Sequence, residues 1–264
     1  MPTLSELRPE YELLFSTCRV NAVKQTEINA IVSKIIANQA RYLVIGKPLG
    51  IPWHFVGIVH QMECNLRFNR HLHNGDPLTA RTVQVPKGRP KAGNPPFTFE
   101  VSANDALVHI GYDKVTEWST ANILYLFEKY NGFGYRRSSI RIPSPYLWSY
   151  SNHYTKGKFA SDGKYDPNLV SKQAGAAVVL RRLSELQAIS FGDQQMSRLR
   201  EIRDLGERVR YAPNTVHADA MRLQELLNLV GYPLQRDGKA GEKTSNAYRE
   251  VSRKYLPGDP RRGN

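Results

Sequence analysis

Residues 53–90 decide the fold and read WHFVGIVHQMECNLRFNRHLHNGDPLTARTVQVPKGRP. The first part is apolar nearly all round and follows Pro52, and proline is favoured in the first turn of a helix. We therefore expect a buried helix whose polar end opens to a cleft. After the turn 74–76, residues 78–85 alternate between apolar and polar, and 86–96 are rich in turn formers. These patterns predict a small hairpin with a long loop directly after the buried helix.

On both sides of this stretch, apolar residues recur at helical spacing. This spacing predicts helices over 11–20, 25–43, 102–111, 120–130 and 171–189. The expected fold is mainly α, with α+β character because the helical body carries the small hairpin beside its cleft.

The C-terminal quarter of the chain changes character. Residues 195–213 are rich in arginine and poor in large apolar groups, which is typical of an exposed basic helical linker. This linker is expected to separate a first domain over 1–194 from a small helical module over 214–264. A chain of 264 residues has room for both.

The charge balance is strongly basic. The chain has 37 Lys and Arg against 24 Asp and Glu, a net charge of +13. A hydrophobic fraction of 41% is ordinary for a globular protein and excludes a disordered polyelectrolyte. The basic residues are spread along the chain, and no helix-turn-helix, zinc-finger or ribonucleoprotein signature accompanies them. We therefore expect an anionic surface as partner and no specific nucleic acid.

Two cysteines, Cys18 and Cys64, can form at most one disulfide, and we expect them to be buried free thiols. The N-terminus has acidic residues where a Sec signal needs a basic start, and no apolar run approaches the roughly 18 residues that span a bilayer. These features predict a protein that is made in the cytoplasm without a Sec signal and without a transmembrane segment. We also expect it to be a monomer.

Glu63 stands at the end of the apolar stretch, where scarcity of water raises a carboxyl pKa as a general acid requires. Asp76 follows in a turn before proline and is expected to be partly solvated and ionised. Two carboxylates in unlike environments are the minimum for glycoside hydrolysis, and Thr79 and Thr82 offer hydroxyls to position a water. The alternative is that Glu63 pairs with Arg67 and that Asp76 only starts a turn.

Together with Asn-Gly-Phe-Gly-Tyr at 131–135 and Ser-Pro-Tyr-Leu-Trp-Ser at 144–149, residues 53–90 resemble bacterial and phage peptidoglycan hydrolases of the lysozyme-like superfamily. Glu63 falls where that superfamily keeps its acid. The Glu63 to Asp76 spacing is also similar to goose-type lysozymes, in which the cleft hairpin follows the catalytic helix. The resemblance implies a muramidase that cleaves the β-1,4 bond of murein glycan strands.

Several activities of this fold stay open. Some goose-type relatives require no second carboxylate, and lytic transglycosylases of similar fold use the acid alone and form an anhydro product. A chitinase of the same fold is a further alternative. Cys64 with His60 one turn earlier would suit an amidase or peptidase, which ranks second. The alternative of another class is a non-catalytic wall-binding or virion structural protein.

A sugar cleft needs aromatic rings that pack on pyranose faces and amides that bind hydroxyls. The candidates for this role are Asn131, Tyr135, Tyr146, Trp148, Asn152 and Tyr154. Any one of these aromatic residues can equally belong to the core. No histidine has a recognisable zinc spacing, so we expect neither a metal nor another cofactor.

The C-terminal module resembles the small three-helix peptidoglycan-binding domain found beside many wall hydrolases. The resemblance rests on Leu-Gln-Glu-Leu-Leu at 223–227, Gly-Tyr-Pro at 231–233, Asp-Gly-Lys-Ala-Gly at 237–241 and Thr244. It departs from that family at 252–256, where Ser-Arg-Lys-Tyr-Leu replaces the usual Phe-Gln. The resemblance implies binding to peptidoglycan at an anionic cell envelope, in the wall or periplasm, after release by lysis or by a non-Sec route.

Overall fold

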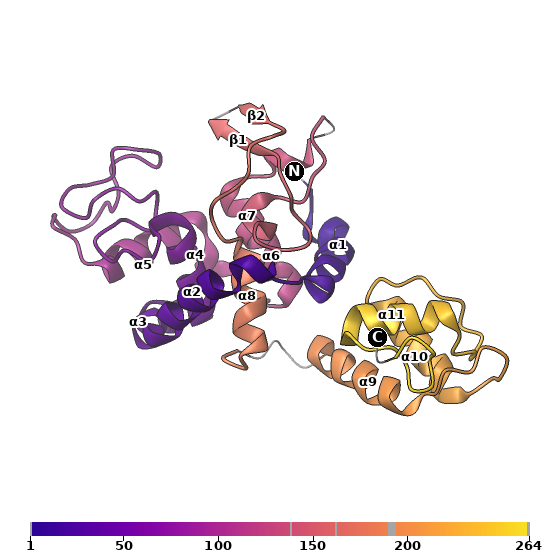
Figure 1. Ribbon diagram of the computed structural model, residues 1–264. Coiled ribbons are helices and arrows are strands. Elements are labelled where there is room, and N and C mark those ends of the chain that lie inside the picture. The colour runs from indigo at the N-terminus through magenta and orange to yellow at the C-terminus, as the bar shows by residue number, and fades with distance from the viewer. Residues whose placement is uncertain (1, 138, 162, 190–193, 263–264) are drawn as a thin grey trace. The chain divides into compact units, whose positions relative to one another are not determined.

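The computed structural model describes every residue except 1, 138, 162, 190–193 and 263–264. The described residues form 11 α-helices and one small antiparallel β-hairpin, with 52% of the chain in helices (Figure 1). The expectation of a mainly helical chain with one small hairpin is confirmed.

The chain divides into two compact units. The first unit comprises Met1–Leu4 and Cys18–Ile189, and the second comprises Ser5–Thr17 and Ser190–Asn264. This division differs from the expected boundaries, because an N-terminal segment belongs with the C-terminal part of the chain.

Helix α4 (Trp53–Cys64) is the centre of the first unit. Ten of its 12 residues are buried, and only Trp53 and Glu63 keep appreciable exposure. The helix packs against α2, α3 and α8. At Gly57 an added Cβ would lie 2.8 Å from Ile35 and 3.0 Å from the Tyr42 ring, so only glycine allows this close packing.

The other helices of the first unit surround α4. They are α2 (Gln25–Ala37), α3 (Gln39–Gly46), α5 (Phe99–Ile110), α6 (Thr120–Asn131), α7 (Pro145–Trp148) and α8 (Ala176–Glu185). The helices expected over 102–111, 120–130 and 171–189 are thus present with shifted ends. The single helix expected over 25–43 is divided at Asn38, whose side-chain amide donates to the Lys34 carbonyl (2.8 Å) and so competes with the helical backbone.

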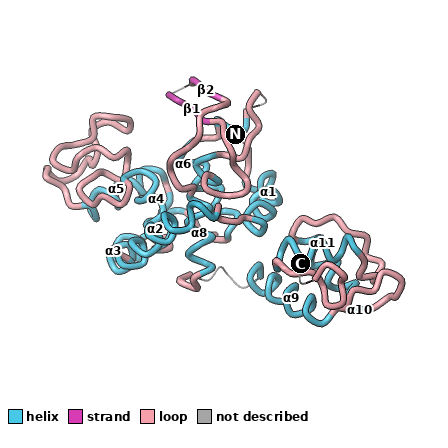
Figure 2. The backbone as a smooth tube through the Cα atoms, in the orientation of Figure 1, coloured by secondary structure: helices cyan, strands magenta, loops and turns pink. Residues whose placement is uncertain are grey.

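The hairpin lies elsewhere in the chain than expected. Strands β1 (Lys158–Ser161) and β2 (Lys164–Asp166) form the hairpin (Figure 2). They pair antiparallel, with Phe159 opposite Tyr165. The prediction of strands over 78–85 is wrong, and that segment is an irregular loop; the nearest pairing is an isolated bridge between Arg70 and Pro77, just before it. Prolines before and after the segment lack the N–H that a ladder needs.

The end of α4 is a sharp turn. Asn65 and Leu66 both adopt the left-handed conformation, with φ of 50° and 58°. The Asn65 N–H donates to the Gln61 carbonyl (3.1 Å) and the Leu66 N–H to the His60 carbonyl (3.3 Å), which closes the helix. The helix therefore ends at Cys64, one residue after Glu63, and Glu63 lies directly before the loop that follows.

The second unit contains α1 (Leu4–Thr17), α9 (Gln194–Arg208), α10 (Ala218–Leu229) and α11 (Glu242–Ser252). The expectation of an exposed linker over 195–213 is wrong, because α9 packs against α10 and α11. Its Leu199, Ile202 and Leu205 belong to the buried core of this unit. Their spacing of three residues places them on one face, and the many arginines between them concealed this stripe in the sequence.

In the part of the chain that the structure describes, no single helix is long and apolar enough to span a membrane. Residues 39–49 and 53–64 reach that length and composition only together, and they are bent by 114°.

Candidate active site

Glu63 is the polar residue that the buried helix α4 presents on its last turn. Its carboxylate accepts a hydrogen bond of 2.8 Å from the Tyr146 hydroxyl. Burial raises the pKa of Glu63 from 4.5 to about 7, although the Tyr146 hydrogen bond acts in the opposite direction. At neutral pH a substantial fraction of Glu63 is therefore protonated and able to donate a proton.

The alternative pairing of Glu63 with Arg67 does not occur. The Arg67 guanidinium instead donates to the Cys64 carbonyl (3.2 Å). Among the described residues, no Lys, Arg or His forms a salt bridge with Glu63. A cation here would lower the Glu63 pKa, so its absence preserves the protonated form.

Tyr146 reaches Glu63 from the short helix α7. Its neighbours Leu147 and Trp148 are buried, and they anchor the helix so that the tyrosine side chain is held toward the acid. Burial and the charge of Glu63 both raise the pKa of Tyr146 well above its ordinary value. Tyr146 therefore stays a hydrogen-bond donor across the physiological pH range.

Two further tyrosines, Tyr112 and Tyr130, lie close enough to Glu63 for its charge to raise their pKa, although burial is the larger cause. Their hydroxyls are engaged elsewhere, since Tyr130 donates to the Leu72 carbonyl (2.8 Å) and Tyr112 to the Leu126 carbonyl (2.9 Å). They supply the desolvated surroundings of the acid. Sequence reasoning missed both, because no short motif links them to Glu63.

The second carboxylate, Asp76, organises the loop that follows α4. Its Oδ2 accepts hydrogen bonds from the backbone N–H of Val83 (2.8 Å) and Gln84 (3.0 Å) and from the Asn74 amide (3.1 Å). Burial by itself raises the pKa of Asp76, but these three hydrogen bonds outweigh it, and the pKa is lowered overall. Asp76 is therefore an ionised carboxylate, and its Oδ2 is committed to loop structure.

The turn that carries Asp76 lies directly against the end of α4. Gly75 has a φ of 79°, and a Cβ added to it would lie 2.9 Å from the Glu63 carbonyl oxygen. Only glycine fits this position without displacing the backbone that carries the acid. The turn and Glu63 are thus structurally coupled.

The two threonines differ. Thr79 is exposed on the loop, whereas Thr82 is buried. The Thr82 hydroxyl donates to the Pro86 carbonyl and accepts from the Arg89 N–H (2.9 Å). Both sides of this hydroxyl are used to close the 82–89 loop, so its observed role is structural.

The six candidate sugar-binding residues fall into three groups. Tyr146 contacts the acid, as described above. Asn131 and Tyr135 line a separate cavity of about 450 Å³ next to β1. Trp148, Asn152 and Tyr154 serve the fold: Trp148 is buried, Asn152 accepts from the Arg19 N–H (2.6 Å), and the buried Tyr154 hydroxyl accepts from the Ser171 N–H (3.0 Å).

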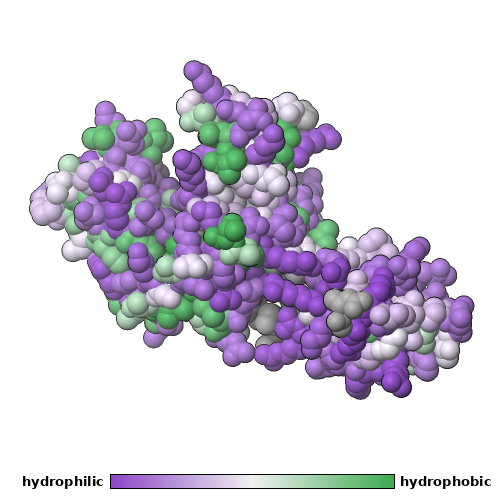
Figure 3. All heavy atoms as spheres, in the orientation of Figure 1, coloured by the Kyte–Doolittle hydropathy of each residue, from purple (hydrophilic) through white to green (hydrophobic). Residues whose placement is uncertain are grey.

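The surface is hollowed between the lobe that contains residues 65–98 and the lobe that carries β1 and β2 (Figure 3). Glu63 belongs to the helix that leads into the first lobe, and Tyr146 belongs to the segment that leads into the second. The Glu63–Tyr146 hydrogen bond therefore joins the end of α4 to α7.

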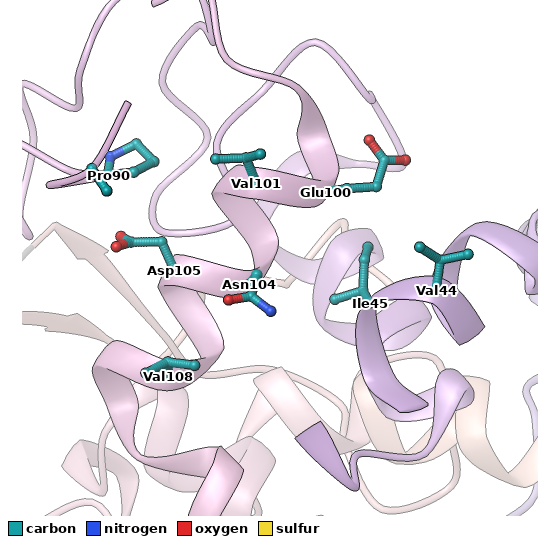
Figure 4. A pocket seen from close by; sticks show the side chains of 9 residues that line it. Val44, Ile45, Pro90, Glu100, Val101, Asn104, Asp105 and Val108 are labelled. Carbon is teal, nitrogen blue, oxygen red and sulfur yellow. The ribbon is translucent and has the colours of Figure 1, made fainter. Parts of the chain in front are cut away.

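Another cavity, of about 450 Å³, lies between α3 and α5 (Figure 4). Apolar side chains line it, and its two carboxylates are neutralised: Glu100 pairs with Arg41 (2.7 Å) and Asp105 with Arg89 (3.0 Å). Neither carboxylate has the environment of a general acid.

Within the described residues, no group of three or more His, Cys, Asp or Glu side chains is arranged to hold a metal ion. Both cysteines are buried free thiols, as predicted. Burial raises the pKa of Cys64 to about 12, and its thiol donates to the His71 carbonyl (3.2 Å). A protonated thiol is a poor nucleophile, which weighs against the amidase or peptidase alternative.

Comparisons with known proteins found no family model, no curated protein and no solved structure that matches this chain.

Proposed function

We propose that this chain is a glycoside-cleaving enzyme of the lysozyme type, a muramidase that acts on the β-1,4 bonds of peptidoglycan. The observation that carries the proposal is the state of Glu63, a desolvated carboxyl with a pKa of about 7 that accepts a hydrogen bond from the Tyr146 hydroxyl. General acid catalysis of glycosidic cleavage needs such a carboxyl, protonated near neutral pH.

In the proposed reaction, Glu63 donates its proton to the glycosidic oxygen as the bond between C1 and that oxygen breaks. Positive charge then develops on the sugar ring, and a water attacks C1 and returns a proton to the Glu63 carboxylate. Asp76, ionised and carried by the turn that packs against the Glu63 carbonyl, supplies negative charge near the site. Tyr146 holds one carboxylate oxygen of Glu63, which leaves the other oxygen to carry the proton.

A lytic transglycosylase is the second candidate, and the Asp76 geometry favours it. Because Oδ2 of Asp76 accepts three hydrogen bonds from its own loop, this carboxylate is poorly placed to activate a water. Without an activated water, the C6 hydroxyl of the same sugar attacks C1 and transfers its proton to Glu63. The product then has a 1,6-anhydro ring and no new reducing end.

Mass analysis of the fragments released from purified peptidoglycan tests both candidates. Hydrolysis adds the mass of one water per cleaved bond, whereas transglycosylation adds none. Chitin oligomers serve as the comparison substrate, because cleavage of chitin and not of peptidoglycan would select the chitinase alternative. Binding to peptidoglycan without release of any fragment would contradict the enzymatic proposal and favour a wall-binding protein.

The second unit is proposed to bind the wall. In its buried network, the Gln224 amide donates to Asp237 (2.8 Å) and to Thr244 (3.2 Å) and accepts from the Gly238 N–H (2.9 Å). The residues that carry the resemblance to peptidoglycan-binding domains therefore hold one loop in shape. Sedimentation of the full-length Glu63→Gln protein with insoluble peptidoglycan tests this role.

A further inference from the structure

The cavity beside the hairpin has features that the proposed chemistry does not use. It lies between the segment that follows α6 and strand β1 and has a volume of about 450 Å³. Phe133 and Phe159 line it and are partly exposed. Phe159 is held edge-on against Tyr135, with 5.0 Å between the ring centroids. The rings give the cavity apolar walls of fixed geometry.

Two cations share this cavity with the rings. Arg137 is exposed and Lys158 is partly exposed, and both line it. Neither forms a salt bridge among the described residues. The neighbouring Arg136 behaves differently, since it binds the buried Glu128 carboxylate through two hydrogen bonds of 2.9 Å and 2.8 Å.

Glu128 thus neutralises the charge of Arg136, whereas the charge of the adjacent Arg137 is available to bind a ligand. Guanidinium and ammonium groups bind carboxylates through charge-assisted hydrogen bonds. Aromatic rings beside them suit the apolar face of a sugar. Asn131, at the same cavity, adds an amide for a hydroxyl or an acetamido group.

We propose that Arg137 and Lys158 bind a carboxylate of peptidoglycan and thereby select murein over chitin. The inference rests on the proposed function and names the ligand chemistry of a binding position within it. Two carboxylates are available, the lactyl carboxylate of a peptide-free strand and those of the stem peptide. Chitin is built from N-acetylglucosamine alone and has neither.

The test measures ligand binding in the full-length Glu63→Gln background, so that no ligand is cleaved during the experiment. Titration calorimetry at low salt compares three ligands: a peptide-free murein tetrasaccharide, the same saccharide with its stem peptides, and chitotetraose. The variant combines Arg137→Gln and Lys158→Gln. The control is Lys164→Gln, which removes one positive charge from an exposed position on the same hairpin.

We expect the double variant to bind a murein ligand about tenfold or more weakly, a loss of at least about 1.4 kcal/mol, because it removes the charge-assisted hydrogen bonds to the carboxylate. Chitotetraose binding and the control variant should be unchanged. A loss on the peptide-free saccharide identifies the lactyl carboxylate, and a loss only on the peptide-bearing saccharide identifies the stem peptide.

Equal weakening of murein and chitin ligands, an equal effect of Lys164→Gln, or no change at all would each overturn the inference. Failure of this inference can be distinguished from failure of the proposed function. That proposal fails if Glu63→Gln retains activity, whereas this inference fails on binding data alone.

Discussion

The effect of the Tyr146–Glu63 hydrogen bond on the Glu63 pKa allows a quantitative prediction of the pH dependence of catalysis. The Tyr146 hydroxyl donates to Oε1 of Glu63 over 2.8 Å and stabilises the ionised carboxylate. A hydrogen bond to a charged group contributes about 1.5–3 kcal/mol, and one pKa unit corresponds to about 1.4 kcal/mol. Tyr146→Phe should therefore raise the pKa of Glu63 from about 7 by about one unit, the lower end of that range, because water replaces part of the lost interaction.

The shift has a definite direction in the rate profile. A general acid works in its protonated form, so activity falls as pH rises through the Glu63 pKa. The wild-type alkaline limb should lie near pH 7, and the Tyr146→Phe limb should lie about one unit higher. The assay is the pH dependence of kcat/KM for release of soluble fragments from peptidoglycan.

Tyr125→Phe is the matched control, because the Tyr125 hydroxyl donates to the Pro2 carbonyl (3.2 Å) and not to Glu63. This control should leave the alkaline limb in place. A limb that stays unchanged in Tyr146→Phe, or that moves to lower pH, would refute the role assigned to this hydrogen bond. A lower maximal rate alone would not, because the position of the limb is the quantity tested.

Three further predictions concern stability and loop structure. Because the folded state raises the pKa of Glu63 from 4.5 to about 7, this group costs stability progressively as pH rises from about 4.5 to about 7, and the loss is complete above that. Glu63→Gln should therefore exceed the wild type by about 3 kcal/mol at pH 8.5 and match it at pH 4 in urea unfolding. Asp76→Ala should accelerate hydrogen exchange at the Val83 and Gln84 amides by at least about tenfold, and unchanged rates would show that the carboxylate does not hold the loop. Ile202→Ala should cost the second unit about 2–5 kcal/mol in thermal or urea unfolding, whereas an exposed linker would lose almost nothing.

The helix and its acid were predictable because both depend on local sequence. A run that is apolar on every side can only be a buried helix or strand, and the preceding proline together with its length favours a helix. A carboxyl at the end of such a run must lose water on folding. The raised pKa of Glu63 follows from these two facts, without knowledge of its neighbours.

The residues that contact Glu63 were harder to predict from the sequence, because they are distant from it along the chain. Tyr146 is 83 residues from Glu63, and only the fold brings them together. Trp148, two residues further along, is in the core, since neighbours on a short helix point in different directions.

The sequence predictions for two segments were wrong, because tertiary contacts outweighed the local sequence pattern. The alternating segment 78–85 lacks a strand partner, and its backbone N–H groups at Val83 and Gln84 bind Asp76 instead. Helix α9 carries seven charged residues among its 15, yet a narrow stripe of three apolar residues is enough to dock it. Both errors arise where a few tertiary contacts decide the structure.

The most direct test of the central claim is the cleavage of purified peptidoglycan by the Glu63→Gln protein. The wild type should release soluble fragments, and the variant should lose at least about a thousandfold in rate, since an amide cannot donate the proton. Glu100→Gln, which removes a carboxylate already paired with Arg41, should retain the wild-type rate. Full activity in Glu63→Gln would contradict the assignment of Glu63 as the general acid.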